Sequence, residues 1–552
     1  MTMSQYLDPQ DVDEPSDADP GSVGTRTASY NLTDLGNAER LIAEYGKDLH
    51  FHPGLGWLVW DGKRWKADLT NPRPDRVIAL AGKTIRKLLS SANRMAEDEN
   101  GNRKRIIAKA LTFESQRALE AMVELARTQP GIPIDLDTLD ADPWKLTVRN
   151  GTLDLRTGIL GPHRREDLIT KLAPVTYDPS ATCPTWMRFL SRIMGEDQGM
   201  LTYLQTIIGY TLTGTTKEKA FFILHGSGDN GKSTLLNVLH ALLGKDYADV
   251  TQTSTLLSKS GDTKEYDLAA LRGTRFVSAV ETKEGMQVNT GLIKQLTGSD
   301  PVKARALFRM PFAYIPGFKI FLAVNHLPII ADLEPAMWGR VHLVPFSVSI
   351  PKPEQDQGLE DRLKKEELPG ILAWAVQGCL LWKKSKGLKK PTVVLQSTKT
   401  YHESQDTVGR FLSECCVLDP KAHVPVAALY DAYLKWEEGH PLGLQPFGAR
   451  LRKMRLEQGK YGKERTRIWL GVRLQADKAD EADSVSRSPI EEESYKRVEN
   501  PVRPVCPVRL LWDGPVDLEE IERALQDVRP WGEDGNVPEG EGEEGQEGED
   551  AA

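Results

Sequence analysis

The feature that most constrains this chain is the stretch FFILHGSGDNGKST at residues 221–234. An apolar, strand-like run leads into a glycine-rich turn, and the helix-like segment STLLNVLHALLG follows it. The turn matches the full pattern G-x-x-x-x-G-K-[ST], whose glycines let backbone N–H groups point at phosphate oxygens. The N-terminus of the following helix adds the positive end of the helix dipole, which also attracts phosphate. The stretch therefore predicts an α/β domain that binds a nucleotide.

The predicted nucleotide site is the loop itself with the first residues of the helix. It consists of Gly226, Ser227, Gly228, Asp229, Asn230, Gly231, Lys232, Ser233 and Thr234. We expect Lys232 to reach the β- and γ-phosphates of ATP, and Ser233 to bind Mg²⁺.

Hydrolysis needs further polar groups, and three candidates follow along the chain. Glu281 ends the strand-like run RFVSAVET and is expected to bind Mg²⁺ or activate water. Asn325 ends KIFLAVNHLP, where an amide can sense the γ-phosphate. Arg340, in AMWGRVHLVPF, is expected to act on the nucleotide of a neighbouring subunit. The simpler interpretations are a helix-capping acid for Glu281 and a surface charge for Arg340.

The charge of the chain is unevenly distributed. The net charge is −8, but residues 476–552 alone carry −15 and residues 1–30 carry −5, so residues 31–475 carry +12. A basic body between two acidic tails favours contact with a polyanion. A solubilising surface is the alternative.

Two basic segments are candidates for DNA contact. In LIKQLTGSDPVKAR, Lys303 and Arg305 alternate along a strand and Arg309 follows, so a row of cations would meet phosphates. Near the C-terminal side, one expected helix carries Arg450, Arg452, Lys453 and Arg455. An edge strand with solvated charges and a purely structural basic face are the respective alternatives.

The chain divides by composition and pattern into six expected segments. These are an acidic disordered tail at 1–30, an α+β N-terminal domain at 31–182, the ATPase core at 183–352, a helical linker at 353–396, a winged-helix-like module at 397–475 and an acidic low-complexity tail at 476–552.

Other features point away from membranes and from metals bound by cysteine. No run of 18 or more apolar residues appears and the N-terminus lacks an apolar core, so we expect a cytoplasmic protein. The five cysteines show no metal-ligand spacing. Trp57, Trp60 and Trp65 lie in an expected hairpin, where they form the core of a small sheet or, less simply, stack on bases.

Together these motifs resemble a known family. GSGDNGKST, AVET, IKQLTGSDPVKAR and FLAVNHLP resemble the motifs of superfamily III helicases, which belong to the AAA+ ring ATPases. Residues 35–65 and 140–158 resemble the N-terminal domain of phage and plasmid primase–helicases related to the poxvirus NTPase. Residues 183–197 resemble that family's bridge into the motor, and 424–454 with 465–474 its winged-helix-like module.

The resemblance implies a replicative DNA helicase of a phage or mobile element, in the host bacterial cytoplasm if phage-encoded. It implies a ring, with a hexamer expected, that uses ATP and Mg²⁺ and travels 3′ to 5′. Its hairpin with Lys303 and Arg305 would grip single-stranded DNA at a fork.

The sequence departs from the family in two places. Thr282 follows Glu281 where many members have a second acid, which leaves the role of Glu281 open. No primase domain is expected, so a separate primase would be a partner. A packaging or loading ATPase that does not unwind DNA, a small-molecule kinase and a scaffold with a vestigial nucleotide site remain alternatives.

Overall fold

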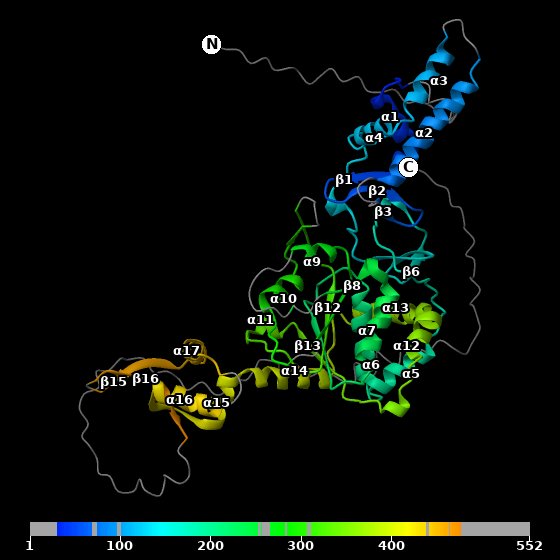
Figure 1. The fold of residues 1–552 in the computed structure, drawn as a ribbon. Helices are drawn as coiled ribbons and strands as arrows, with labels where there is room; N and C mark the ends of the chain where they lie inside the picture. The colour runs from blue at the N-terminus through cyan, green and yellow to red at the C-terminus, as the bar shows by residue number, and fades with distance from the viewer. Residues whose placement is uncertain are drawn as a thin grey trace, which may run out of the picture. The chain divides into compact units, whose positions relative to one another are not determined.

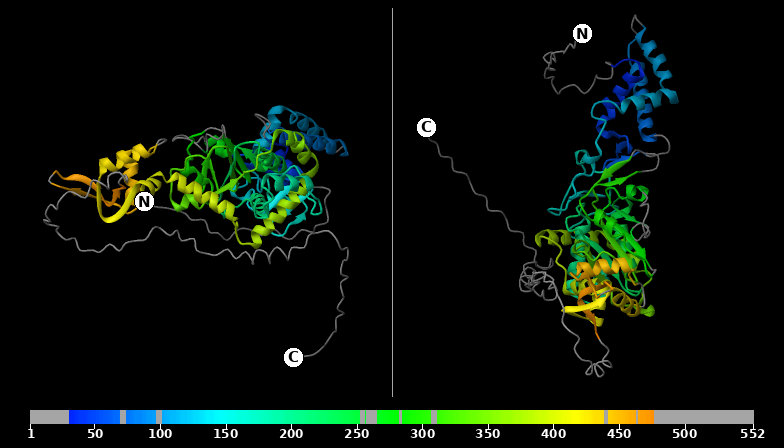
Figure 2. Two further views of the ribbon diagram at one scale, coloured as in Figure 1. Left: turned by 90° about the horizontal axis from the view of Figure 1, so that it is seen from below. Right: turned by 90° about the vertical axis from the view of Figure 1, so that its left-hand side faces the viewer.

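The computed structural model describes most of the chain between residues 30 and 475 (Figures 1 and 2). The described residues are 30–68, 74–96, 101–251, 256, 265–281, 284–305, 311–437, 441–462 and 464–475. Two compact units are present. One is Met1–Glu414 with Tyr430–Arg450, and the other is Cys415–Leu429 with Leu451–Ala552. Arg309 and both acidic tails lie outside the described residues.

A parallel sheet forms the centre of the first unit. Its strands run in the order β13-β7-β12-β9-β8, and every neighbouring pair is parallel. Their bounds are β7 Phe221–His225, β8 Ala248–Val250, β9 Phe276–Glu281, β12 Lys319–Val324 and β13 Val341–Pro345. All six residues of β12 are buried, as expected of a strand covered on both faces. The parallel arrangement places all five carboxyl ends at one edge of the sheet.

Helices cover both faces of this sheet (Figure 1). Phe222 and Leu224 of β7 join one apolar cluster, and Phe221 and Ile223 join the other. The first face packs against α5 Pro184–Ile193, α6 Gln198–Thr211, α7 Lys232–Tyr247 and α13 Leu368–Lys384. The second packs against α10 Thr290–Leu296, α11 Pro335–Trp338 and part of α14 Thr392–Gln405. The α/β expectation is therefore confirmed.

Helix α13 is part of the core, although its sequence suggested a linker. Trp374 and Trp382 of this helix are 8% and 4% exposed. The backbones of α6 and α13 touch. A methyl group on Gly209 would lie 2.1 Å from the backbone N of Cys379, and one on Gly378 would lie 2.0 Å from the carbonyl of Gln205.

The N-terminal part combines helices with a small antiparallel sheet, as the α+β prediction required. Trp57 and Trp65 are 5% and 1% exposed, so the core interpretation is correct for these two, while Trp60 is half-buried. The sheet order is β1-β2-β3. The elements are α1 Asp34–Tyr45, β1 Leu49–His52, β2 Gly56–Trp60, β3 Trp65–Ala67, α2 Asp75–Asn93, α3 Asn102–Thr112 and α4 Gln116–Ala126.

A second hairpin sheet joins the apolar core of the parallel sheet. It consists of β4 Lys145–Val148, β5 Gly151–Asp154 and β6 Ile159–Gly161. Leu146, Val148 and Leu153 are fully buried in the same cluster as α6 and α7. The buried Arg275, which precedes β9, donates to the carbonyls of Pro143 at 2.8 Å, Lys145 at 2.8 Å and Leu212 at 2.6 Å. This packing joins residues on both sides of the boundary expected at 182 in one apolar core.

The remaining elements of the first unit are short or lie near its end. A hairpin is formed by β10 Val302–Ala304 and β11 Phe312–Tyr314, and α9 Glu265–Ala270, α12 Leu359–Arg362 and α15 Thr407–Cys415 are helical. Phe411 of α15 packs against Tyr433 of α16 and Phe447 of α17, with ring centroids 5.5 and 6.3 Å apart. Helix α16 spans Val426–Trp436 and α17 spans Leu444–Lys453. Single 3₁₀ turns occupy Gly46–Asp48, Leu136–Thr138, Arg165–Asp167 and Lys352–Glu354, and a π turn Leu363–Glu367 precedes α13.

The second unit is built around an antiparallel sheet. Its strands are β14 Cys416–Pro425, β15 Glu457–Tyr461 and β16 Thr466–Leu474, in the order β14-β16-β15. Trp469 and Val472 are fully buried. Over the residues that the structure places, no helix is both long and apolar enough to cross a bilayer.

Candidate functional site

Three strand ends bring the predicted catalytic segments together. Val324, the last residue of β12, lies in register with His225 of β7 on one side and Glu281 of β9 on the other. Because neighbouring strands lie about 4.8 Å apart, these three strand ends span roughly 10 Å. The glycine-rich loop that is predicted to bind phosphate follows His225, and Asn325 follows Val324. Glu281 is placed by its backbone; its side chain lies outside the described part of the structure.

The loop backbone adopts conformations that favour glycine. The φ angles are +108° at Gly228 and +82° at Gly231, which caps α7. Gly226 is required for a different reason, since a methyl group there would lie 2.4 Å from the carbonyl oxygen of Phe346. The loop is also tied to the segment after β13, because Ile350 N donates to the carbonyl of Asp229 at 2.8 Å. The sequence thus fixes a turned loop ahead of α7.

Lys232 is held inside this loop as a buried cation. Its Nζ donates to the carbonyl of Gly226 at 2.6 Å and to Oδ1 of Asn230 at 3.0 Å. Asn230 in turn donates to the carbonyl of Phe346 at 3.2 Å. Burial lowers the pKa of Lys232. No described carboxylate forms an ion pair with it, so an anionic phosphate would be its natural counter-charge.

The remaining loop residues suit phosphate and metal contacts. Ser227, Asp229 and Ser233 are exposed, and Thr234 is half-buried. Ser233 stands in the first turn of α7, where its hydroxyl can reach a cation shared with phosphates. Mg²⁺ is commonly bound through one or two protein oxygens plus substrate phosphates. The hydroxyl of Ser233 and the carboxylate of Glu281 at a neighbouring strand end are the right kinds of ligand.

His225 is a site residue that the motif search did not single out. It ends β7 beside the loop, and burial together with the nearby Lys232 charge lowers its pKa. Its ring also interacts with the backbone of the half-buried Asn325. A polar residue that ends an otherwise apolar strand was the signal available in the sequence.

Arg340 lies at the opposite edge of the sheet. Its carbonyl accepts from Phe221 N at 2.7 Å, at the start of β7, whereas the phosphate-binding loop follows the end of β7. Five residues of extended strand separate the two, roughly 16 Å. Arg340 Nε donates to Oγ1 of Thr297 at 3.1 Å, and its guanidinium also reaches the carbonyl of Ala336. If Arg340 contacts ATP, that ATP must therefore be bound to another subunit.

The bond between Arg340 and Thr297 gives a testable expectation. Removal of the Thr297 hydroxyl by Thr297→Val should lower ATP turnover about 10-fold or more, because a hydrogen bond to a charged group contributes about 1.5–3 kcal/mol. The affinity for ATP should change little, and Thr297→Ser should restore turnover. Steady-state ATPase assays on the assembled protein measure both. Normal turnover by Thr297→Val would show that this bond does not position Arg340.

The basic hairpin and the basic helix differ in how their cations are held. Lys303 and Arg305 are exposed, while Val302 and Ala304 are each 1% exposed, so Lys303 lies on the outer face of β10 and Arg305 follows directly after the strand. On α17, Arg450 is bound by Asp406, with Nη2 at 2.6 Å and Nε at 3.2 Å. Arg452, Lys453 and Arg455 are exposed, but α17 ends at Lys453, so Arg455 follows the expected helix and does not lie on it. The ion pair gives Arg450 a structural role that the sequence did not reveal.

Comparison with known proteins places these features in a family. Residues 38–195 match the family described as D5 N terminal like, and residues 403–491 match the Poxvirus D5 protein-like family. Residues 224–336 match a family of unknown function. A candidate helicase of Acanthamoeba polyphaga mimivirus is 30% identical over 345 residues, which cover 58% of this chain and 36% of the relative. A candidate primase of African swine fever virus (isolate Tick/Malawi/Lil 20-1/1983) is 26% identical over 330 residues, 54% of this chain and 34% of the relative.

The two D5 family matches and these relatives support a D5-type primase–helicase family for this chain. A candidate helicase of Frog virus 3 (isolate Goorha) is a further relative of this D5-type chain, 23% identical over 381 residues, 54% of the chain and 39% of the relative. The chain spans only about a third of the length of these curated relatives. Among solved structures, the apo C-terminal region of NrS-1 aligns with a TM-score of 0.36 and 9% identity over 64% of this D5-type chain and 90% of that one. Similarity at that level bears on neither site nor function.

Proposed function

We propose that this D5-type chain is an ATP-driven replicative DNA helicase of a phage or mobile element. The observation that carries the proposal is the register of three parallel strand ends, which sets the loop with its buried Lys232 beside Glu281 and Asn325. In this proposal Lys232 binds the β- and γ-phosphates, and the Asn325 amide contacts the γ-phosphate and the attacking water. Glu281 supports hydrolysis. Ser233 and Glu281 would hold Mg²⁺, which when bound neutralises charge on the phosphates.

The position of Arg340 supports sites that are shared between subunits. Its place at the amino edge of the sheet separates it from the loop of its own chain. A ring of AAA+ type, with a hexamer as the expected size, would bring the amino edge of one subunit to the nucleotide of the next. Arg340 would then neutralise charge in the transition state of the neighbour.

The two basic elements supply the proposed DNA contacts. Lys303 and Arg305 stand on the outer face of the β10–β11 hairpin, which suits contact with the phosphates of one strand in a ring channel. The chain order α15, β14, α16, α17, β15, β16 has three helices and a three-stranded antiparallel sheet, which supports a winged-helix-like module. Arg452, Lys453 and Arg455 are its candidate phosphate contacts. Forked DNA is the expected substrate, and a separate primase the expected partner.

Unwinding of a forked duplex with ATP and Mg²⁺ tests the proposal. Strand separation should be lost in Lys303→Ala with Arg305→Ala, although nucleotide binding should persist because neither residue belongs to the proposed nucleotide site. Lys217→Ala with Lys219→Ala, which removes two cations before β7, is the matched control. The polarity follows from moving the single-stranded arm. ATP hydrolysis with translocation along duplex DNA but without strand separation would favour a packaging or loading ATPase instead.

A further inference from the structure

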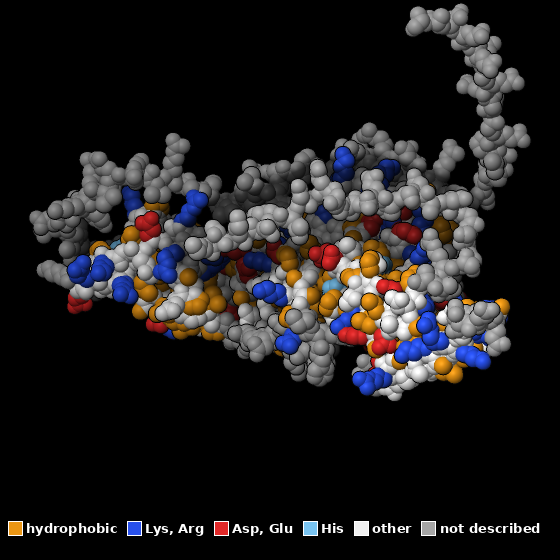
Figure 3. Space-filling model, turned by 90° about the horizontal axis from the view of Figure 1, so that it is seen from above, with side chains coloured by type: hydrophobic (Ala, Val, Ile, Leu, Met, Phe, Trp, Pro, Cys, Tyr) orange, Lys and Arg blue, Asp and Glu red, His pale blue; other side chains and the backbone are white. Residues whose placement is uncertain are grey.

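Helices α2 and α3 of the N-terminal part carry an unusual excess of positive charge. Together they contain eight Lys and Arg residues, one acidic residue and no aromatic residue. Lys87 of α2 forms an ion pair with Glu44 of α1 at 2.9 Å. Figure 3 looks onto this end of the chain and shows several Lys and Arg side chains at its surface.

Helix α3 places its cations where an isolated helix would tolerate them least. Arg103, Lys104 and Arg105 fall in its first turn, although the positive end of the helix dipole disfavours cations there. Arg105 and Lys109 are four residues apart on one face, where like charges repel. The helix contains no acidic residue, and Gly101 caps it without a side-chain hydrogen bond. Local electrostatics that oppose the fold are a sign of a functional surface.

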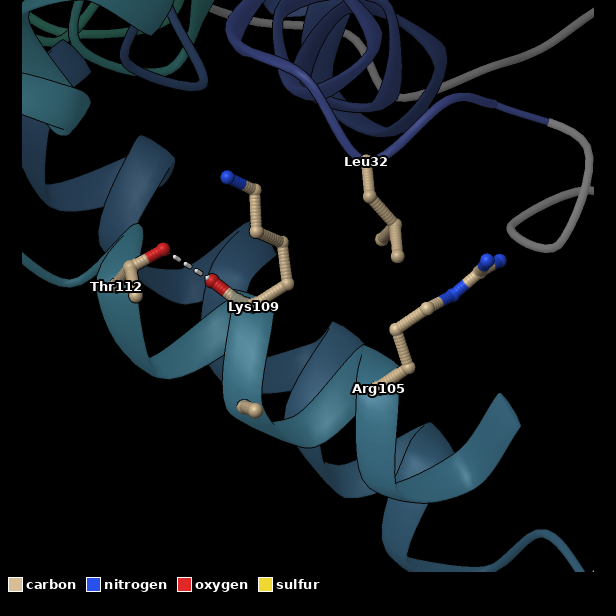
Figure 4. A pocket seen from close by; sticks show the side chains of 5 residues that line it. Leu32, Arg105, Lys109 and Thr112 are labelled. Carbon is tan, nitrogen blue, oxygen red and sulfur yellow. Dashed lines mark hydrogen bonds between the residues drawn. The ribbon is translucent and has the colours of Figure 1, made fainter. Parts of the chain in front are cut away.

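The same face of α3 borders an open hollow of about 490 Å³ (Figure 4). The side chains of Arg105 and Lys109 line it opposite Leu32, with Lys109 Nζ 5.4 Å from the centroid of the Phe113 ring, and Thr112 continues the row one turn later. Ala108 completes the lining. Residues 105, 109 and 112 follow the i, i+4, i+7 spacing of one helix face, and Arg105 and Lys109 are about 6 Å apart along the axis. An extended anion that runs along the helix would meet both cations.

We propose that this face of α3, with Arg105, Lys109 and Thr112, binds the phosphate backbone of double-stranded DNA independently of sequence. Cations without base-contacting groups recognise the backbone, which carries no direct sequence information. Proteins that bind single strands usually add aromatic side chains on which bases stack, and neither α2 nor α3 has one. This surface lies outside the proposed motor site and requires no nucleotide. It would hold the duplex ahead of the fork.

Equilibrium binding of a blunt 30-base-pair duplex to the full chain, without nucleotide and between 50 and 200 mM salt, tests the inference. Arg105→Ala with Lys109→Ala should weaken binding about tenfold at 100 mM salt. The slope of log K against log salt should become less negative by about 2, since each phosphate contact contributes about 0.9. Arg105→Lys with Lys109→Arg keeps both charges and should bind nearly as the original chain does.

Two control variants of the chain make the result decisive. Lys384→Ala with Lys389→Ala removes two exposed cations elsewhere, and its binding should stay unchanged. Lys232→Met should also bind the duplex normally, which separates this surface from the motor. The inference is overturned if the α3 variant keeps the original slope, if the Lys384 and Lys389 variant loses as much affinity, or if only single-stranded binding falls. Thermal unfolding should show that the α3 variant remains folded, because both side chains are exposed.

Discussion

Replacing Lys232 with methionine should reduce ATP hydrolysis on the order of 10³-fold, because the loop loses the cation that we propose stabilises charge on the phosphates. The folded chain should nevertheless keep nearly its original stability. The methionine side chain fills similar space, and the penalty of burying a charged amine disappears. The carbonyl of Gly226 loses its donor, which costs about 1–3 kcal/mol. These two effects oppose each other.

Thermal unfolding with and without Mg²⁺ and ATP measures both the stability of the folded chain and its ability to bind ATP. The original chain should unfold at a higher temperature when ATP is present, because a ligand that binds only the folded state stabilises it. Lys232→Met should show no such increase. Lys245→Met, at the other end of the same helix and exposed, should behave like the original chain. An ATP-dependent increase that survives in Lys232→Met would contradict the assignment of this lysine.

Gly209→Ala should destabilise the chain by roughly 3–5 kcal/mol, although alanine normally favours a helix. The added methyl group would lie 2.1 Å from the backbone N of Cys379 and 2.3 Å from the carbonyl carbon of Gly378. Backbone atoms cannot rotate away, so α6 and α13 would have to separate. That movement would open the apolar cluster behind the phosphate-binding loop.

Gly82→Ala in α2 is the matched control for this effect. Its methyl group would meet only the guanidinium of Arg86, at 3.8 Å. This change should therefore stabilise α2 by up to about 1 kcal/mol through helix propensity alone. Chemical denaturation followed through the helical signal compares the two variants. Equal midpoints for Gly82→Ala and Gly209→Ala would show that α6 and α13 do not touch as closely as described.

The parts of the site that follow from local pattern could be predicted from the sequence. A buried strand followed by the Gly226–Ser233 motif fixed the position of the loop, and polar residues at strand ends indicated Glu281 and Asn325. The loop, Glu281 and Asn325 come close together provided that the strands that carry them are parallel neighbours. The alternation of Val302, Lys303, Ala304 and Arg305 likewise indicated which side chains face outward.

The parts that depend on distant contacts could not be predicted. Nothing near Arg450 in the sequence indicates that Asp406, 44 residues away, binds its guanidinium. The bond from Arg340 to Thr297 joins residues 43 apart. Helix α13 looked like a linker because its partner α6 lies far back in the chain. In each case the chemistry of the residue was evident and its partner was not.

The buried packing of β4 and β5 also limits how such a chain could be divided or recombined. A fragment that starts at residue 183 would expose the surfaces that Leu146, Val148 and Leu153 cover, and would leave the Arg275 guanidinium without two of its three carbonyl partners. A fragment that starts near residue 140 would keep both. Exchange of N-terminal segments among relatives should therefore be poorly tolerated at a junction near residue 182.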